Sequence, residues 1–198
     1  MRPVSRRLSS LDSFTRCASP PDRVVADWPD DTARAPTTIL AAAIAVADTV
    51  AAFAGDPDAV EIKWPNDVLL GGLKTSGILM ELSAEATRVV FLVLGIGVNL
   101  NVDRRAFPEE FRATATSLAS HCGHPIDRIA FARRLYNGLE QALDTCAERG
   151  FEALRPRFEA RFRMRGRPVT VIELDGSRQR GVAEGVANDG ALLLRRDD

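Results

Sequence analysis

Lysine is nearly absent from this chain of 198 residues. Of its 26 basic residues only Lys63 and Lys74 are lysines, and every other one is arginine. Arginine cannot replace lysine where a site needs a compact ammonium group with rotatable donors, so two nearby lysines draw attention to the segment that holds them. Two random positions fall this close about one time in nine, so the residues around them must decide whether they mark a site.

Other scarcities limit the class of protein. The three cysteines, Cys17, Cys122 and Cys146, are too few for a disulfide framework and fit a reducing, cytoplasmic compartment. No run reaches about 18 uninterrupted apolar residues, so we expect no transmembrane helix and no membrane partner. The net charge of −1 argues against nucleic-acid binding as the main role.

Three local patterns favour ordinary structural interpretations. His121, Cys122 and His124 match no standard zinc spacing, so we expect a polar loop and no metal site. The arginine-rich run 155–167 is typical of a solvated helix face, with a partner-facing patch as the alternative. The Arg- and Ser-rich N-terminus is similar to an organellar transit peptide but lacks an apolar face.

The pattern of apolar residues predicts an α+β fold. Residues 37–54 are Ala-rich and apolar nearly all round, which predicts a buried helix capped by Thr37 or Thr38. A period of two then predicts an antiparallel meander packed on this helix. Its strands are expected over 60–70, 73–83 and 88–100. Pro65 cannot donate to a ladder, so we expect the first strand to bulge there.

The C-terminal half is predicted to be helical and then β again. Residues 127–148 have helical spacing, and a shorter helix is expected over 151–163. From Arg167 three short strands are separated by the turns DGS and NDG. The chain then divides into an irregular segment 1–35, a core 36–164 and a small β module 165–198, whose last strand leaves an unpaired edge.

The chemistry-bearing residues concentrate in the segment 63–78. Lys63, Asn66, Asp67 and Lys74 are polar insertions in an otherwise apolar hairpin. Asp67 and Lys74 flank the Gly71-Gly72 turn, so strand pairing should bring them together. A carboxylate beside an ammonium suits the handling of an anion and an incoming nucleophile. The alternative is an ordinary surface ion pair.

Two further stretches suggest close approach of a ligand. Thr75 and Ser76 offer hydroxyls, and Gly77 allows a ligand to reach the backbone. Glycines at 95 and 97 weaken a central strand unless something must approach it or a bulge lies there. Asn99, which follows them, offers a donor and an acceptor suited to a base edge or a ribose.

These motifs together resemble those of the biotin protein ligases. The resemblance rests on KWPND at 63–67, on Lys-x-x-Gly-Ile-Leu at 74–79 and on GIGVNLN at 95–101. It covers about residues 35–198. It implies a class II synthetase-like biotin/lipoyl ligase fold, with an antiparallel or mixed sheet packed with helices. The segment 165–198 is similar to the small SH3-like C-terminal domain of that family, truncated.

The resemblance also implies a reaction and a set of roles. Biotin and Mg-ATP would give biotinoyl-5′-AMP, which a lysine of the biotin carboxyl carrier protein of acetyl-CoA carboxylase would attack. Lys74 would neutralise the biotin carboxylate and the α-phosphate, Asp67 would orient the carrier lysine, and Asn66 would support it. The remaining binding residues would be Gly77, Ile78, Gly97, Asn99 and Lys63. Magnesium would accompany ATP, and a homodimer is compatible with the open sheet edges.

The sequence departs from the family at its N-terminal end. It lacks the GRGRxGR loop that covers biotin and the adenylate phosphates, so 1–35 is expected to reflect a deletion or a wrong start or frame. Residues 24–27 are similar to the strand that precedes this loop. No helix-turn-helix is seen, so repressor function is not expected. Loss of the loop would impair the ligase. The alternatives are a catalytically dead remnant that binds a carrier or partner protein, and a lipoate-protein ligase, against which KWPND argues.

Overall fold

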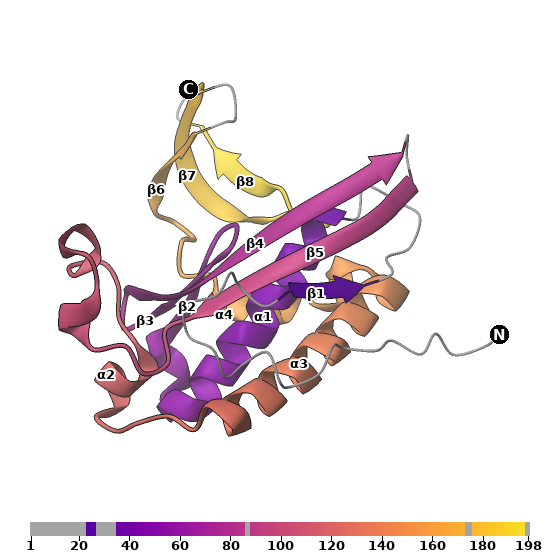
Figure 1. Cartoon of the computed structure of the whole chain (residues 1–198). Coiled ribbons are helices and arrows are strands. Elements are labelled where there is room, and N and C mark those ends of the chain that lie inside the picture. Colours follow the sequence, from indigo (N-terminus) through magenta and orange to yellow (C-terminus); the bar gives the residue numbers. More distant parts are fainter. Residues whose placement is uncertain (1–22, 27–34, 86–87, 173–175, 197–198) are drawn as a thin grey trace.

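A five-stranded antiparallel sheet and a layer of helices make up most of the chain in a computed structural model, which describes residues 23–26, 35–85, 88–172 and 176–196 (Figure 1). The sheet has the order β1-β5-β4-β3-β2, so the last four strands form the expected meander and β1 adds to its far edge. The strands are β1 (Arg23–Ala26), β2 (Val60–Lys63), β3 (Asp67–Leu70), β4 (Leu73–Glu85) and β5 (Arg88–Val98).

The Ala-rich segment forms the central helix α1 (Ala35–Ala54), which begins two residues before the predicted start. The predicted caps Thr37 and Thr38 therefore lie inside the helix, and both are buried. The helix is long and apolar enough to cross a membrane, yet 72% of its most apolar window is buried inside the fold. Burial thus accounts for its composition, because an interior helix has no polar face to present.

A second long helix, α3 (Arg128–Arg149), packs along α1 on one side of the sheet (Figure 1). Its start is capped by Asp127, whose carboxylate accepts from the backbone N–H groups of Ile129 and Ala130. Gly138 allows the close approach, since a β-carbon there would lie 3.7 Å from that of Ala45.

Shorter helices complete the layer. They are α2 (Leu118–Cys122) and α4 (Arg155–Arg161), with single 3-10 turns at Pro57–Ala59, Arg104–Ala106, Glu109–Phe111 and Phe151–Ala153. The predicted helix 151–163 is thus divided in two. Phe158 of α4 is fully buried, stacks on Phe162 and meets Phe151 edge-on. Asp48 of α1 accepts from Arg157 and Arg161. These contacts fix α4 against α1.

The expected bulge lies elsewhere than at Pro65. Residues 64–66 form a tight turn with a cis Trp64-Pro65 bond, which divides the predicted strand 60–70 into the hairpin β2–β3. The register shift falls instead between β3 and β4, where Val68 faces Ser76 but Leu69 faces Lys74. Thr75 is therefore the extra residue of a β-bulge. Proline needs no ladder partner in a turn, so the prediction of a break was right and that of its form was wrong.

The C-terminal residues form the predicted three-stranded antiparallel sheet. Its strands are β6 (Pro168–Ile172), β7 (Arg178–Val186) and β8 (Leu192–Arg195), in that order. Ala183 and Val186 of β7 are buried in the main core, so this small sheet is packed onto the rest of the chain. Its NDG turn lies against the first turns of α1, where a β-carbon on Gly190 would come within 3.2 Å of the Leu40 side chain.

Candidate active site

One row of residues crosses four strands of the large sheet. Strand pairing places Lys63 opposite Asp67, Asp67 opposite Gly77 and Gly77 opposite Gly97. Their neighbours Ile62, Val68 and Ile78 are buried in the core that α1 covers. Because side chains alternate along a strand, the row itself lies on the face turned away from α1.

The bulge at Thr75 brings Lys74 onto this same face. Lys74 and Gly77 are three positions apart, so regular alternation would put them on opposite faces. With the extra residue, Lys74 is half-exposed on the outer face, whereas Thr75 and Ser76 both turn inward and are buried. Bulges commonly redirect a side chain in this way beside a functional site.

Lys74 and Asp67 then form the predicted ion pair. The Lys74 Nζ lies 2.6 Å from Asp67 Oδ1, and the Asp67 side chain keeps 17% of its surface exposed. The lysine chain lies over Gly77, where a β-carbon would come within 3.2 Å of Lys74 Cε and 3.3 Å of Nζ. Gly77 therefore leaves room for the ammonium group, and its predicted contact with biotin stays a prediction.

The backbone of Lys74 is held by the loop that precedes α2. Lys74 N donates to Thr114 O at 2.8 Å, and Thr116 N donates to Lys74 O at 2.9 Å, so Ala115 forms a short parallel bridge with Lys74. Sequence reasoning missed this loop, because its residues carry no motif. The contact fixes the lysine on both sides of its α-carbon.

The two predicted asparagines also hold the backbone near the ion pair. Asn66 Nδ2 donates to Ile78 O at 2.8 Å and Asn66 O accepts from Ile78 N, which ties the 64–66 turn to β4. Asn99 N donates to Thr75 O, and Asn99 Nδ2 donates to Thr116 O at 3.1 Å. Asn99 thus joins the end of β5 to the bulge and to the loop that holds Lys74.

Some predicted groups lie away from the ion pair. The Ile78 side chain faces the core and is 2% exposed, so it does not reach the outer face. The hydroxyls of Thr75 and Ser76 are buried without a hydrogen-bond partner among the described residues. Lys63 is exposed at the end of the row, opposite Asp67. Gly97 faces outward, and among the described residues only the Gly77 carbonyl oxygen lies within 4 Å of its β-carbon position, at 3.9 Å.

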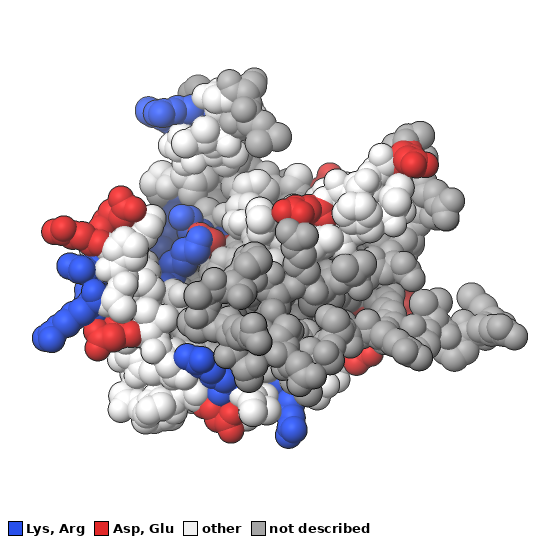
Figure 2. Space-filling model, viewed as in Figure 1, with Lys and Arg blue, Asp and Glu red and all other residues white. Residues whose placement is uncertain are grey.

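The outer face near the row therefore combines one ion pair with a floor of two adjacent glycines. A flat backbone floor lets a ligand ring lie directly on the sheet, and an ammonium at its edge can bind an anionic group. In Figure 2, which views the molecule as in Figure 1, the blue and red groups of the described residues are interspersed on the visible face and form no continuous basic patch there. Such a surface fits a small anionic ligand better than a polyanion.

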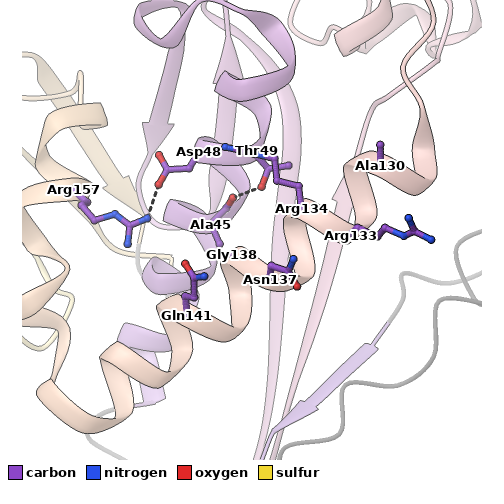
Figure 3. A pocket seen from close by; sticks show the side chains of 10 residues that line it. All are labelled: Ala45, Asp48, Thr49, Ala130, Arg133, Arg134, Asn137, Gly138, Gln141 and Arg157. Carbon is purple, nitrogen blue, oxygen red and sulfur yellow. Dashed lines mark hydrogen bonds and ion pairs between the residues drawn. The ribbon is translucent and has the colours of Figure 1, made fainter.

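A groove lies elsewhere on the molecule, between α1, α3 and α4 (Figure 3). This groove of about 620 Å³ has a floor that includes Ala45 and Gly138. Its one carboxylate, on Asp48, is already bound by Arg157 and Arg161. Figure 3 shows Arg133 pointing away from Arg157, so the arginines do not converge on one point. The groove is a seam between helices and not a site of convergent polar groups.

The His-Cys-Gly-His stretch also has ordinary partners. Cys122 Sγ donates to Phe53 O at 3.7 Å, and burial raises the pKa of this thiol. His124 Nδ1 lies 3.0 Å from Pro125 O. Within the described ranges no three His, Cys, Asp or Glu side chains gather in a way that could hold a metal ion.

Comparison with known proteins gives matches over this same region. Residues 27–99 match the model of the biotin/lipoate A/B protein ligase family. The chain is 34% identical over 165 residues to the bifunctional ligase/repressor BirA of Bacillus spizizenii, a match that covers 83% of this chain and 50% of the relative. It is 35% identical over 158 residues to the biotin–[acetyl-CoA-carboxylase] ligase of Paracoccus denitrificans, covering 78% and 64%. The chain thus spans between half and two thirds of these relatives.

The fold has a matching solved structure as well. The apo biotin protein ligase of Aquifex aeolicus superposes with a TM-score of 0.75 at 25% identity, covering 87% of this chain and 72% of that one. The same enzyme has been solved in complex with biotin and ATP, and that structure gives a TM-score of 0.73. Residues 27–99 thus match the biotin/lipoate A/B protein ligase family, and the α+β sheet-and-helix fold is shared with the Aquifex enzyme. By sequence and by fold, the chain is similar to the biotin protein ligases.

Proposed function

We propose that this chain joins biotin to a lysine of a biotin carboxyl carrier protein through biotinoyl-5′-AMP. The observation that carries the proposal is the Lys74–Asp67 pair, set at 2.6 Å beside the glycine floor of the sheet. The Aquifex enzyme, whose fold this chain shares, binds biotin and ATP. The Paracoccus relative is a ligase for acetyl-CoA carboxylase.

In the first step the biotin carboxylate oxygen attacks the α-phosphorus of ATP, and pyrophosphate leaves with the bonding electrons. Negative charge gathers on the α-phosphoryl oxygens in the transition state. The Lys74 ammonium, held above Gly77, is the described cation best placed to offset that charge. Magnesium would enter with ATP, since Asp67 is the one acidic member of the row and Mg²⁺ commonly binds through substrate phosphates.

In the second step a carrier lysine attacks the carbonyl carbon of the mixed anhydride, and AMP departs with the electrons of the broken bond. The carrier lysine approaches as an ammonium, gives one proton to solvent before it attacks, and loses a second proton once the amide bond forms. Asp67, partly exposed beside Lys74, would attract and orient the incoming ammonium. A carboxylate is a weak base toward an ammonium group, so orientation is its main role.

The segment before α1 sets how fast this chemistry runs. Eight residues, 27–34, join β1 to α1, and they contain no Gly-Arg-Gly-Arg sequence. Without those arginines less of the phosphate charge is offset, and the adenylate is less protected from water. We expect turnover well below that of a relative that has the loop. A cytoplasmic location and a homodimer are further expectations. Residues 165–198 are proposed to be a truncated SH3-like domain.

Biotin-dependent release of pyrophosphate from Mg-ATP tests the first step directly. The wild-type chain should release pyrophosphate only when biotin is present, and Lys74→Met should abolish this release. If the wild-type chain releases no pyrophosphate while a full-length ligase assayed in parallel as a positive control does, the proposal is contradicted.

The missing loop favours a second candidate function, a catalytically inactive remnant that binds a carrier protein. Calorimetry separates the two, because a remnant would bind the carrier domain but neither biotin nor a stable adenylate analogue. A lipoate ligase is the third candidate, and lipoate should then compete with biotin for adenylation.

A further inference from the structure

The tryptophan of the KWPND motif touches the small C-terminal sheet. Trp64 Nε1 donates a hydrogen bond of 2.9 Å to the backbone oxygen of Gly190, 126 positions away. Gly190 is buried and lies at the end of the NDG turn that joins β7 to β8. The rest of the Trp64 ring packs against the main core. This hydrogen bond therefore links the 64–66 turn of the hairpin β2–β3 to the small sheet.

The receiving turn, Ala187–Gly190, is itself tightly held. Gly190 N donates to Ala187 O, and Arg155 of α4 donates to the Asn188 side chain at 3.0 Å. Gly190 has a φ of +90° and fits against Leu40 without room for a side chain. The turn is therefore a fixed point, built by α1, α4 and the small sheet together, and Trp64 is fastened to it.

The donating turn, residues 64–66, has two anchors, and both lie just before Asp67 in the chain. Asn66 fastens residues 64–66 to β4 through two hydrogen bonds with Ile78. Trp64 fastens the same turn to Gly190. Asp67 follows immediately and begins β3, so the position of its carboxylate depends on how this turn is seated.

We infer that Trp64 is a positioning residue, which uses the NDG turn of the small sheet to hold Asp67 against Lys74. The kinetic consequence rests on the proposed ligase function, whereas the mechanical coupling does not. Loss of the Trp64 anchor leaves the Asn66 anchor and the strand pairing in place, so the fold is retained. The ion pair, however, is no longer held to one geometry, and misplacement by about 1 Å can cost about 10²-fold in rate.

The kinetic test compares variants at the two ends of the contact. Trp64→Phe keeps an aromatic ring but removes the donor, and should lower kcat for biotin adenylation roughly tenfold with KM for biotin nearly unchanged. Asn188→Ala loosens the receiving turn and should lower kcat in the same direction, and the double variant should be no slower than Trp64→Phe. Glu184→Gln, which removes the exposed ion pair between Glu184 of β7 and Arg195 of β8, is the matched control and should match wild type. Unchanged kcat in Trp64→Phe would overturn the inference.

A second measurement needs no turnover. The chain has two tryptophans, so Trp28→Phe leaves the Trp64 indole as the one ¹⁵N indole signal. In that background Asp67→Asn should change the indole N–H shift and its exchange with water, because coupling between two sites is reciprocal. Asp58→Asn, which removes the Asp58–Arg163 ion pair instead, should leave the indole signal unchanged. An indole signal unaffected by Asp67→Asn would refute the coupling, whereas a coupled signal in an inactive protein would refute only the ligase function.

Discussion

Replacement of Gly77 by alanine should slow the proposed adenylation without unfolding the chain. The added β-carbon would lie 3.2 Å from Lys74 Cε, 3.3 Å from Nζ and 3.6 Å from Asp67 Oδ1. Carbon atoms in contact normally lie about 3.5–4.0 Å apart. The new methyl group therefore occupies space that the lysine chain uses, and the flexible end of Lys74 must move away.

The expected effects on stability and rate differ strongly. Alanine reduces the entropy that a strand glycine loses on folding, which gains roughly 0.5–1 kcal/mol. A displaced, half-exposed ion pair loses about 0–1 kcal/mol, so the free energy of unfolding should hardly change. A shift of the ammonium by a few tenths of an ångström should lower biotin-dependent pyrophosphate release by up to about 10-fold.

A matched control tests whether the effect belongs to this position. Gly138→Ala also adds a methyl group, but its closest neighbour, Ala45 Cβ, is at an ordinary 3.7 Å. This variant should keep the wild-type rate and gain about 1 kcal/mol from helix propensity. Wild-type activity in Gly77→Ala, at an unchanged melting temperature, would refute the placement of Lys74 over Gly77.

Four further predictions follow from single residues. Lys74→Arg should lower the rate of adenylation roughly 100-fold despite keeping the charge, because a planar guanidinium does not fit above Gly77. The free energy of unfolding, measured with urea, should change by less than about 1 kcal/mol. Ser76→Ala should raise the free energy of unfolding by about 1 kcal/mol, since it removes a buried hydroxyl with no partner among the described residues. Ser117→Ala should lower the free energy of unfolding by a similar amount, because Ser117 caps α2 and donates to Val102 O. Burial raises the pKa of the Cys122 thiol, so less of it is thiolate at neutral pH. Alkylation of Cys122, monitored by peptide mass, should therefore be slower than that of free cysteine and should become faster as the pH rises. Excess lipoate should leave biotin adenylation unchanged, and strong competition would favour the lipoate ligase.

The local features of the fold could be predicted from the sequence. The Ala-rich helix α1, the Gly71-Gly72 turn and the long apolar run of β5 all follow from short-range preferences. The Lys74–Asp67 pair was predictable for the same reason, because a hairpin brings the residues that flank its turn together. The two residues lie seven positions apart, and the pairing of β3 with β4 decides their contact.

The features that complete the site could not be predicted in this way. The bulge at Thr75 depends on how β4 meets β3 and β5 at once, and no residue type there demands it. The bridge from Lys74 to Ala115 and the bond from Trp64 to Gly190 join segments far apart in the chain. Such contacts depend on how elements pack, so the sequence around either partner contains no sign of the other.

Transfer of biotin to a carrier protein is the measurement that bears most directly on the central claim. The wild-type chain, biotin, Mg-ATP and a carrier domain are incubated together, and the intact mass of the carrier is followed with time. The account predicts a single biotinoyl addition on one carrier lysine, at a rate below that of a ligase with the arginine-glycine loop, and none with Lys74→Met. An unmodified carrier after prolonged incubation, with a full-length ligase active in parallel, would contradict the claim.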